Sequence, residues 1–350
     1  MYVEDSYMRF FFVLLVSSLS FGQAWVAQQS GTTASLRGIS AVSREVAWAS
    51  GANGTFVVTT DGGETWKAST VPGAADLDFR GIHAFDPKTV ILMSAGSGEK
   101  SRLYKTTDGG ATWKLLYTNP DPAGFFDAIA FWDAKHGILL GDPVHGHFVI
   151  LTTDDGGQTW EDRKAPRIWE RSAMPLALLG EGAFAASNSS LVVLGANEAW
   201  FGTGGRGGAR VFHTLDGGKT WTIGATTIKS ENENAGIFSM GFSDPLHGIA
   251  VGGDHTQPQS KTNTISVTSD GGKKWSSPFS TPNGYRSGVL YLPDQKLWIA
   301  VGTNGSDVSP DGGLTWRPFD KQPLNAMSFV LSYAGWAVGP DGAIFRFSME

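Results

Sequence analysis

The chain has 350 residues, of which 46 are Gly and 13 are Trp, and only 17% are charged. This composition favours short strands joined by tight turns over helical bundles, which are rich in Glu, Lys, Leu and Ala. The net charge of −6 excludes a phosphate-binding surface spread over the whole molecule, and the absence of Cys excludes disulfides and thiolate metal sites. We therefore expect no nucleic-acid partner.

The first 24 residues have the pattern of a signal peptide. Residues 10–21 form an apolar run that is too short to span a bilayer but typical of a signal-peptide core. Glu4 and Asp5 stand where positive charge is expected, an objection that disappears if translation begins at Met8. Small residues at 22 and 24 fit cleavage before Trp25. We expect residues 1–24 to direct export, to the periplasm or outside the cell; the alternative is a buried N-terminal strand.

The stretch "TTDGGETW" (59–66) recurs five times along the chain. The other copies are "TTDGGATW" (106–113), "TDDGGQTW" (153–160), "TLDGGKTW" (214–221), "TSDGGKKW" (268–275) and "SPDGGLTW" (309–316). Their aspartates are spaced by 47, 47, 61, 54 and 41 residues. Repeats of this period indicate a propeller or a solenoid.

We call each of these six copies a box. Between the boxes, the sequence alternates apolar and polar residues over short runs, as in "GISAVSREVAWASGANGTFVVTT". Each unit predicts three strands, and the box predicts the hairpin turn into a fourth, which makes one propeller blade. In the turn, Gly can adopt positive φ, the Asp carboxylate can accept backbone N–H groups, and the Trp can pack against the neighbouring blade. We assign structural roles to Asp61, Trp66, Asp108, Trp113, Asp155, Trp160, Asp216, Trp221, Asp270, Trp275, Asp311 and Trp316.

A seventh three-strand unit covers residues 325–348, but no box follows it. Its outer strand is predicted near the N-terminus, where "WVAQQSG" (25–31) resembles the strand after the first box, "WKASTVPG" (66–73). Trp25 would replace the missing box Trp, and the pairing would remove an exposed sheet edge. Residues 25–350 are thus predicted to form one all-β, seven-bladed β-propeller with four antiparallel strands per blade, closed by the N-terminal strand.

The long connections are predicted on the face opposite the boxes, and a binding site is expected there because long loops on a rigid scaffold usually carry function. Just before the innermost strands, "LRGIS" and "FRGIH" place Arg37 and Arg80 at equivalent positions. Further candidates are Asp127 at the matching place in blade three, Arg286 nearby in blade six, and Trp169 and Arg171 in the long loop before blade four. Arginines that converge can bind carboxylates in bidentate fashion; the alternative is solvated loop arginines or arginines bonded to carbonyls.

Two other motifs do not support a site. "GTGGRG" (202–207) fits a dinucleotide-binding pattern, but a strand rather than a helix is predicted to follow it. Asp142, His145 and His147 offer metal-ligand chemistry on one loop without a fixed third element, so no metal and no cofactor are predicted.

The six boxes resemble the Asp-box (BNR) repeat, and a single exported seven-bladed propeller of this length resembles the photosystem II stability/assembly factor family and its bacterial relatives. That resemblance implies a monomeric, non-catalytic assembly protein that binds a protein or peptide client, including a membrane-protein segment, through an arginine cluster, without being an integral membrane protein itself. The alternative is a glycan-binding protein or a sialidase-like hydrolase. Tyr285 and Tyr291 are then the nearest tyrosine candidates, and Asp127 lacks an evident second carboxylate.

Overall fold

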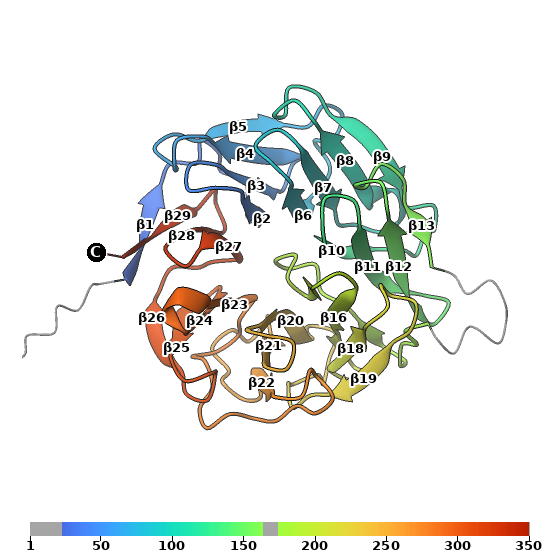
Figure 1. Ribbon diagram of the computed structural model, residues 1–350, viewed down its shortest axis with the longest axis vertical. Helices are drawn as coiled ribbons and strands as arrows, with labels where there is room; N and C mark the ends of the chain where they lie inside the picture. Colours follow the sequence, from blue (N-terminus) through green and yellow to red (C-terminus); the bar gives the residue numbers. More distant parts are fainter. Residues whose placement is uncertain (1–22, 164–173, 350) are drawn as a thin grey trace, which may run out of the picture.

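The computed structural model describes residues 23–163 and 174–349. Seven antiparallel sheets stand around a central axis as the blades of a β-propeller (Figure 1). This confirms the predicted all-β, seven-bladed fold. In blades one to six the strands pair in chain order from the axis outwards, because each is joined to the next along the chain; in blade seven the outer strand comes from the N-terminus.

Blade one contains β2 (Leu36–Ala41), β3 (Ala47–Gly51), β4 (Thr55–Thr59) and β5 (Lys67–Thr70). Blade two contains β6 (Phe79–Ala84), β7 (Val90–Ser94), β8 (Arg102–Thr106) and β9 (Lys114–Thr118), with the 3-10 turn η1 (Gly98–Lys100). Blade three contains β10 (Phe126–Phe131), β11 (Gly137–Val144), β12 (His147–Thr153) and β13 (Glu161–Asp162). Blade four contains β15 (Leu191–Leu194), β16 (Glu198–Gly202), β18 (Arg210–Thr214) and β19 (Thr222–Ala225).

Blade five contains β20 (Ala235–Phe242), β21 (Gly248–Asp254) and β22 (Ile265–Thr268). Blade six contains β23 (Gly288–Leu292), β24 (Leu297–Gly302), β25 (Gly305–Ser309) and β26 (Arg317–Asp320), with the 3-10 turn η3 (Pro293–Gln295). Blade seven contains β27 (Ala326–Leu331), β28 (Ala334–Val338), β29 (Ile344–Met349) and β1 (Gln23–Gln28). The short strands β14 (Glu181–Gly182) and β17 (Gly204–Gly205) extend the sheet of blade five beyond β20.

The box is a turn held together by its own side chains. In the first copy, Thr65 donates its backbone N–H and its hydroxyl to the Asp61 carboxylate, at 2.9 Å and 2.5 Å. Thr59 donates its hydroxyl to the same carboxylate and accepts the N–H of Gly63, whose φ of 87° requires Gly. These hydrogen bonds, those from Thr65 first, lower the pKa of Asp61 to about 2. In this copy the side chains of the box bond the turn to itself.

The box tryptophans lie between blades. Trp160 of blade three packs edge-on against Phe131 and joins a core cluster that includes Ile91 of blade two. Its indole N–H donates to the Gly157 carbonyl at 3.0 Å. Outer strands begin one residue after the Trp, as β5 does at Lys67. The box Trp, at the start of the outer strand, therefore packs between its own blade and the preceding one.

The N-terminal strand closes the ring as predicted. In blade seven, β1 lies beside β29 (Figure 1). In this pairing Trp25 lies opposite Phe347. Trp25 is 7% exposed and contacts Phe319 of blade six and Phe329 of blade seven, which is the position of a box Trp. Residues 1–22, most of the predicted signal peptide, lie outside the described residues, and β1 begins within the last two residues of that predicted segment.

Blade five departs from the pattern. Among the described residues its fourth strand is reduced to one bridge between Val267 and Ser276. In blades one to five, the box turn is bonded to the first turn of its own blade; in blade three, for example, the Gly156 N–H donates to the Lys135 carbonyl. Both kinds of turn therefore lie on one face, which we call the box face, and the longer connections lie on the other.

Candidate functional site

A bulge occurs at the same place in the inner strands of four blades. The pairing register skips one residue between the first and second strands of blades one, two, three and five. The residues skipped are Arg37, Arg80, Asp127 and Phe238. Arg37, Arg80 and Asp127 thus occupy the same position in the pairing register of their blades. A bulged residue leaves the ladder and re-aims its side chain, and these four define what we call the channel mouth.

The arginines of the channel mouth lie close to each other. Arg80 donates Nε to Asp78 at 2.7 Å and Nη1 to the Ala185 carbonyl at 3.3 Å. Arg37 is half-buried, and its buried Nε has no hydrogen-bond partner among the described residues. Burial and then the charge of Arg80 lower the pKa of Arg37, while Asp78 and Tyr285 oppose this. Two guanidinium groups beside the Asp78 carboxylate leave an excess of positive charge, which suits an anionic group.

Asp127 is enclosed in the wall beside these arginines. It is 1% exposed, and both carboxylate oxygens lack a hydrogen-bond partner among the described residues. Burial and then the charge of Asp142 raise the pKa of Asp127 well above its usual value, and Arg80 only partly offsets them. Asp142 accepts the Ala183 N–H at 2.8 Å, and burial raises its pKa as well. Sequence reasoning treated Asp142 as a loop residue and missed this pairing of acids.

Residues 184–189, which we call the plug, cross the channel between opposite blades. Asn188 donates to the Ile129 carbonyl at 3.0 Å and accepts the Ile129 N–H at 2.8 Å, in blade three. On the other side, Ser187 donates to the Ser287 carbonyl at 2.6 Å, before blade six. This part of the chain extends towards the axis of the ring (Figure 1). The plug forms a floor below the channel mouth.

Aromatic rings complete this floor. Phe184 of the plug stacks on Phe238 at a centroid distance of 3.9 Å, and Tyr285 meets Phe238 edge-on at 4.8 Å. Tyr285 is 4% exposed, and burial raises its pKa. Phe238 was missed from the sequence, although "IFSMG" aligned with "LRGIS" places it at the bulge.

The remaining sequence candidates occupy different places. Arg286 is 1% exposed and is held inside the wall by an ion pair with Asp307 and a hydrogen bond to Asn304. Its guanidinium therefore does not face the channel mouth. Trp169 and Arg171 lie outside the described residues.

A wide cavity adjoins the channel mouth on its outer side. It has a volume of about 720 Å³ and runs from Asp142 and Phe184 to Leu178 and Leu179. Leu179 is 98% exposed. Exposed leucine side chains thus lie next to the channel mouth, in a cavity that is also lined by Asp142, Glu181 and Glu233.

In the described part of the chain, no group of three His, Asp or Glu side chains is placed to hold a metal ion. Over those same residues, no helix is long and apolar enough to cross a membrane.

Comparison with known proteins agrees with the repeat and the fold. The BNR/Asp-box repeat family matches residues 57–68. The chain is 30% identical over 145 residues to the photosystem II assembly lipoprotein Ycf48 of Picosynechococcus sp.. That match spans 37% of this chain and 39% of the relative, or about two fifths of its length.

Solved propellers cover nearly the whole chain. A structure described as YCF48 bound to D1 peptide aligns with 93% of this chain and 97% of its own, at 20% identity and a TM-score of 0.64. YCF48 from Cyanidioschyzon merolae aligns over 93% and 99%, at 18% identity and a TM-score of 0.60. U3-55K aligns over 92% and 98%, at 11% identity and a TM-score of 0.62. Identities this low show the fold alone; the present chain is an Asp-box propeller that resembles the photosystem II assembly factors.

Proposed function

We propose that this chain is an exported, non-catalytic propeller that binds an extended segment of a protein client at the channel mouth. The observation that carries this proposal is the Arg37–Arg80 pair, two guanidinium groups beside the Asp78 carboxylate and the buried Asp127 carboxyl, whose pKa is raised by burial. Arg37 is only half-buried and its side chain makes no hydrogen bond among the described residues, so the terminal nitrogens of its guanidinium can bind a carboxylate, and part of their desolvation has already occurred. Acidic side chains of the client are the expected contacts.

The plug determines how a client lies. Because residues 184–189 bridge blade three and blade six below the mouth, a chain cannot pass through the channel and must lie across it. The cavity beside Leu178 and Leu179 then receives apolar side chains of the same segment. A client with an acidic stretch next to apolar residues fits both surfaces.

Similar proteins support a binding role over catalysis. The relative that is 30% identical over 145 residues is a photosystem II assembly lipoprotein. The propeller with the TM-score of 0.64 is described as bound to a D1 peptide. In this chain the Asp127 carboxylate is sealed from solvent, so in this conformation it cannot reach a glycan as an acid or a nucleophile. A D1 peptide is therefore the first client to test.

The test is a binding titration with a labelled D1 peptide, followed by capture from a native envelope extract if that peptide fails to bind. Arg37→Gln, Arg80→Gln and the double variant remove charge at the mouth, and Arg317→Gln is the matched control on the exposed strand β26. We expect the double variant to weaken binding by at least about tenfold and the control to leave it unchanged, because hydrogen bonds to charged groups are the strong ones. Unchanged binding in a folded double variant would remove this site assignment.

A further inference from the structure

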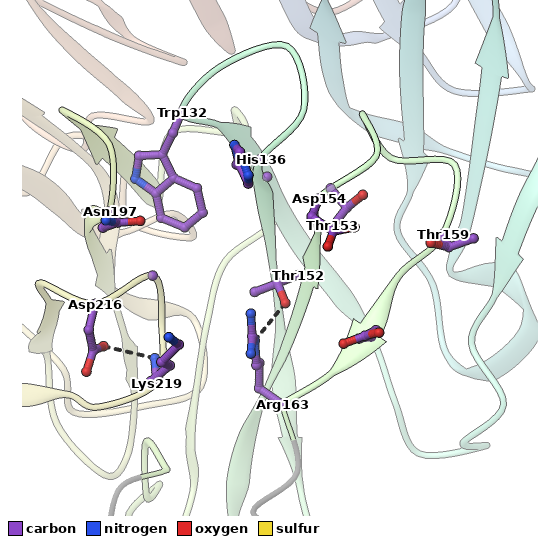
Figure 2. Close-up of a pocket in the computed structure, with 13 residues that line it drawn as sticks. Trp132, His136, Thr152, Thr153, Asp154, Thr159, Arg163, Asn197, Asp216 and Lys219 are labelled. Carbon is purple, nitrogen blue, oxygen red and sulfur yellow. Dashed lines mark hydrogen bonds between the residues drawn. The ribbon is translucent and has the colours of Figure 1, made fainter.

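A second pocket lies on the box face, between blades three and four, away from the channel mouth. It has a volume of about 160 Å³. Figure 2 shows the Trp132 ring on one side, with Asn197 and Lys219 of blade four facing Asp154 and Arg163 of blade three. Trp132 is half-buried, and its indole N–H is already bonded to the Glu198 carbonyl at 2.7 Å. Its ring is therefore fixed in place where it lines the pocket.

Several polar groups in this pocket have capacity to bind a ligand. Within the part of the chain that the structure describes, Asp154, Glu161, Asn197 and the ammonium of Lys219 make no side-chain hydrogen bond or ion pair. Arg163 uses Nε to bond the Thr152 hydroxyl at 2.7 Å, which orients its guanidinium (Figure 2). In contrast, the Asp216 carboxylate is occupied by its own box. The open groups are two carboxylates, one amide and two cations.

The molecule contains an equivalent crevice with different chemistry. Between blades five and six, a pocket of about 540 Å³ is lined by the residues that follow the same repeat positions. There, Ser243, Ser269, Ser276 and Leu314 stand in place of Trp132, Asp154, Glu161 and Lys219, respectively. The scaffold of these crevices thus comes from the repeat, but the charged and aromatic lining of the pocket at blades three and four does not.

We propose that the pocket between blades three and four binds one ring of a neutral, hydroxyl-rich ligand, a sugar pyranose. A volume of about 160 Å³ is below the ~300 Å³ of the smallest drug-sized pockets, so one ring is the limit. An anion would meet Asp154 and Glu161, and a cation would meet Arg163 and Lys219. Hydroxyl groups both donate and accept hydrogen bonds, so they can bond to the two carboxylates and to the two cations. The apolar face of the ring then lies on Trp132. The site is separate from the proposed client site and does not depend on it.

The probes are glucose, galactose and N-acetylglucosamine, with glycine and glycerol tested alongside, in saturation-transfer NMR titrations of the whole protein. Asp154→Ser and Lys219→Leu copy the residues of the equivalent crevice, and both positions are exposed. Ser269→Asp in that crevice is the matched control. We expect saturable binding of at least one pyranose, weakened about tenfold or more by either variant and unaffected by the control.

Three results would overturn the proposal. One is no saturable binding of any pyranose, and another is equal binding by wild type, Asp154→Ser and Lys219→Leu. The third is binding of glycine instead of the pyranoses, which would assign the pocket to zwitterions. Thermal unfolding of each variant shows whether it is folded, and Glu161→Ser replaces either variant that is not.

Discussion

Two aspartates, Asp61 in a box and Asp127 at the channel mouth, show how differently the two faces of the disc use the same side chain. Asp61 is half-exposed, accepts several hydrogen bonds within its own turn, and has its pKa lowered to about 2. Asp127 is enclosed, has no hydrogen-bond partner among the described residues, and has its pKa raised. Among the described residues, the first environment recurs in the other boxes, whereas the second is that of Asp127 in blade three.

Residues that recur in every repeat of this molecule therefore stabilise the fold. Residues that differ between repeats are the ones to examine for binding. The box satisfies its charges locally, so each copy stabilises its own blade. The channel mouth places Arg37, Arg80, Asp127 and Phe238 at one repeat position with four environments. Unsatisfied charge there is a cost to stability that a ligand can offset.

The largest effect is expected on the box side. Trp160→Ala removes a ring that is 8% exposed and lies between blades two and three. We expect the free energy of unfolding to fall by about 4 kcal/mol, because Trp-to-Ala changes in a core leave a large cavity. Urea denaturation measures it. Client binding by the folded fraction should be unchanged. If the folded variant also bound the client more weakly, the two faces would not have separate roles.

Much of this fold could be predicted from residue patterns alone. The spacing of "DGG" boxes predicted the blades, and Trp25 predicted the closing strand, because both rest on local patterns that repeat. The plug could not be predicted, since residues 184–189 have no counterpart in other blades and their partners, such as Ile129 and Ser287, are distant in the sequence. Arg286 was assigned to the mouth because nothing local shows that Asp307 folds back to enclose it.

A second prediction separates the enclosed arginine from the open one. Arg286→Met should lower the free energy of unfolding by about 3 kcal/mol, because it leaves Asp307 buried without its partner. Arg37→Met should cost far less, since its Nε makes no hydrogen bond among the described residues. Denaturation of both variants tests this. If a stable Arg286→Met variant bound the client more weakly, Arg286 would have to be assigned to the channel mouth after all.

A third prediction concerns the sign of an aspartate substitution. Asp127→Asn should raise the free energy of unfolding at neutral pH by about 1 kcal/mol, because it removes a buried group with an ionisation penalty. Its raised pKa means that the folded state holds the proton more tightly, so wild-type stability falls as pH rises above the unfolded value of about 3.9. The Asp127→Asn variant should not show this fall of stability with pH. Asp61→Asn should show the opposite sign, and thermal melts from pH 4 to pH 8 compare the two.

The smallest expected effect concerns the box aspartate itself. Thr65→Val removes the hydroxyl that lies 2.5 Å from the Asp61 carboxylate, which is the largest cause of its lowered pKa. Carboxyl NMR titration should show the pKa of Asp61 rising from about 2 towards its usual value, while the pKa of Asp108 stays near 2. Stability linked to Asp61 is present above the unfolded pKa and is lost as pH falls through the folded one, so the variant should lose less of it on acidification. An unshifted pKa of Asp61 would mean that backbone N–H groups and the Thr59 hydroxyl suffice to hold its charge, and the threonine at position 65 would then be explained by turn geometry rather than by charge.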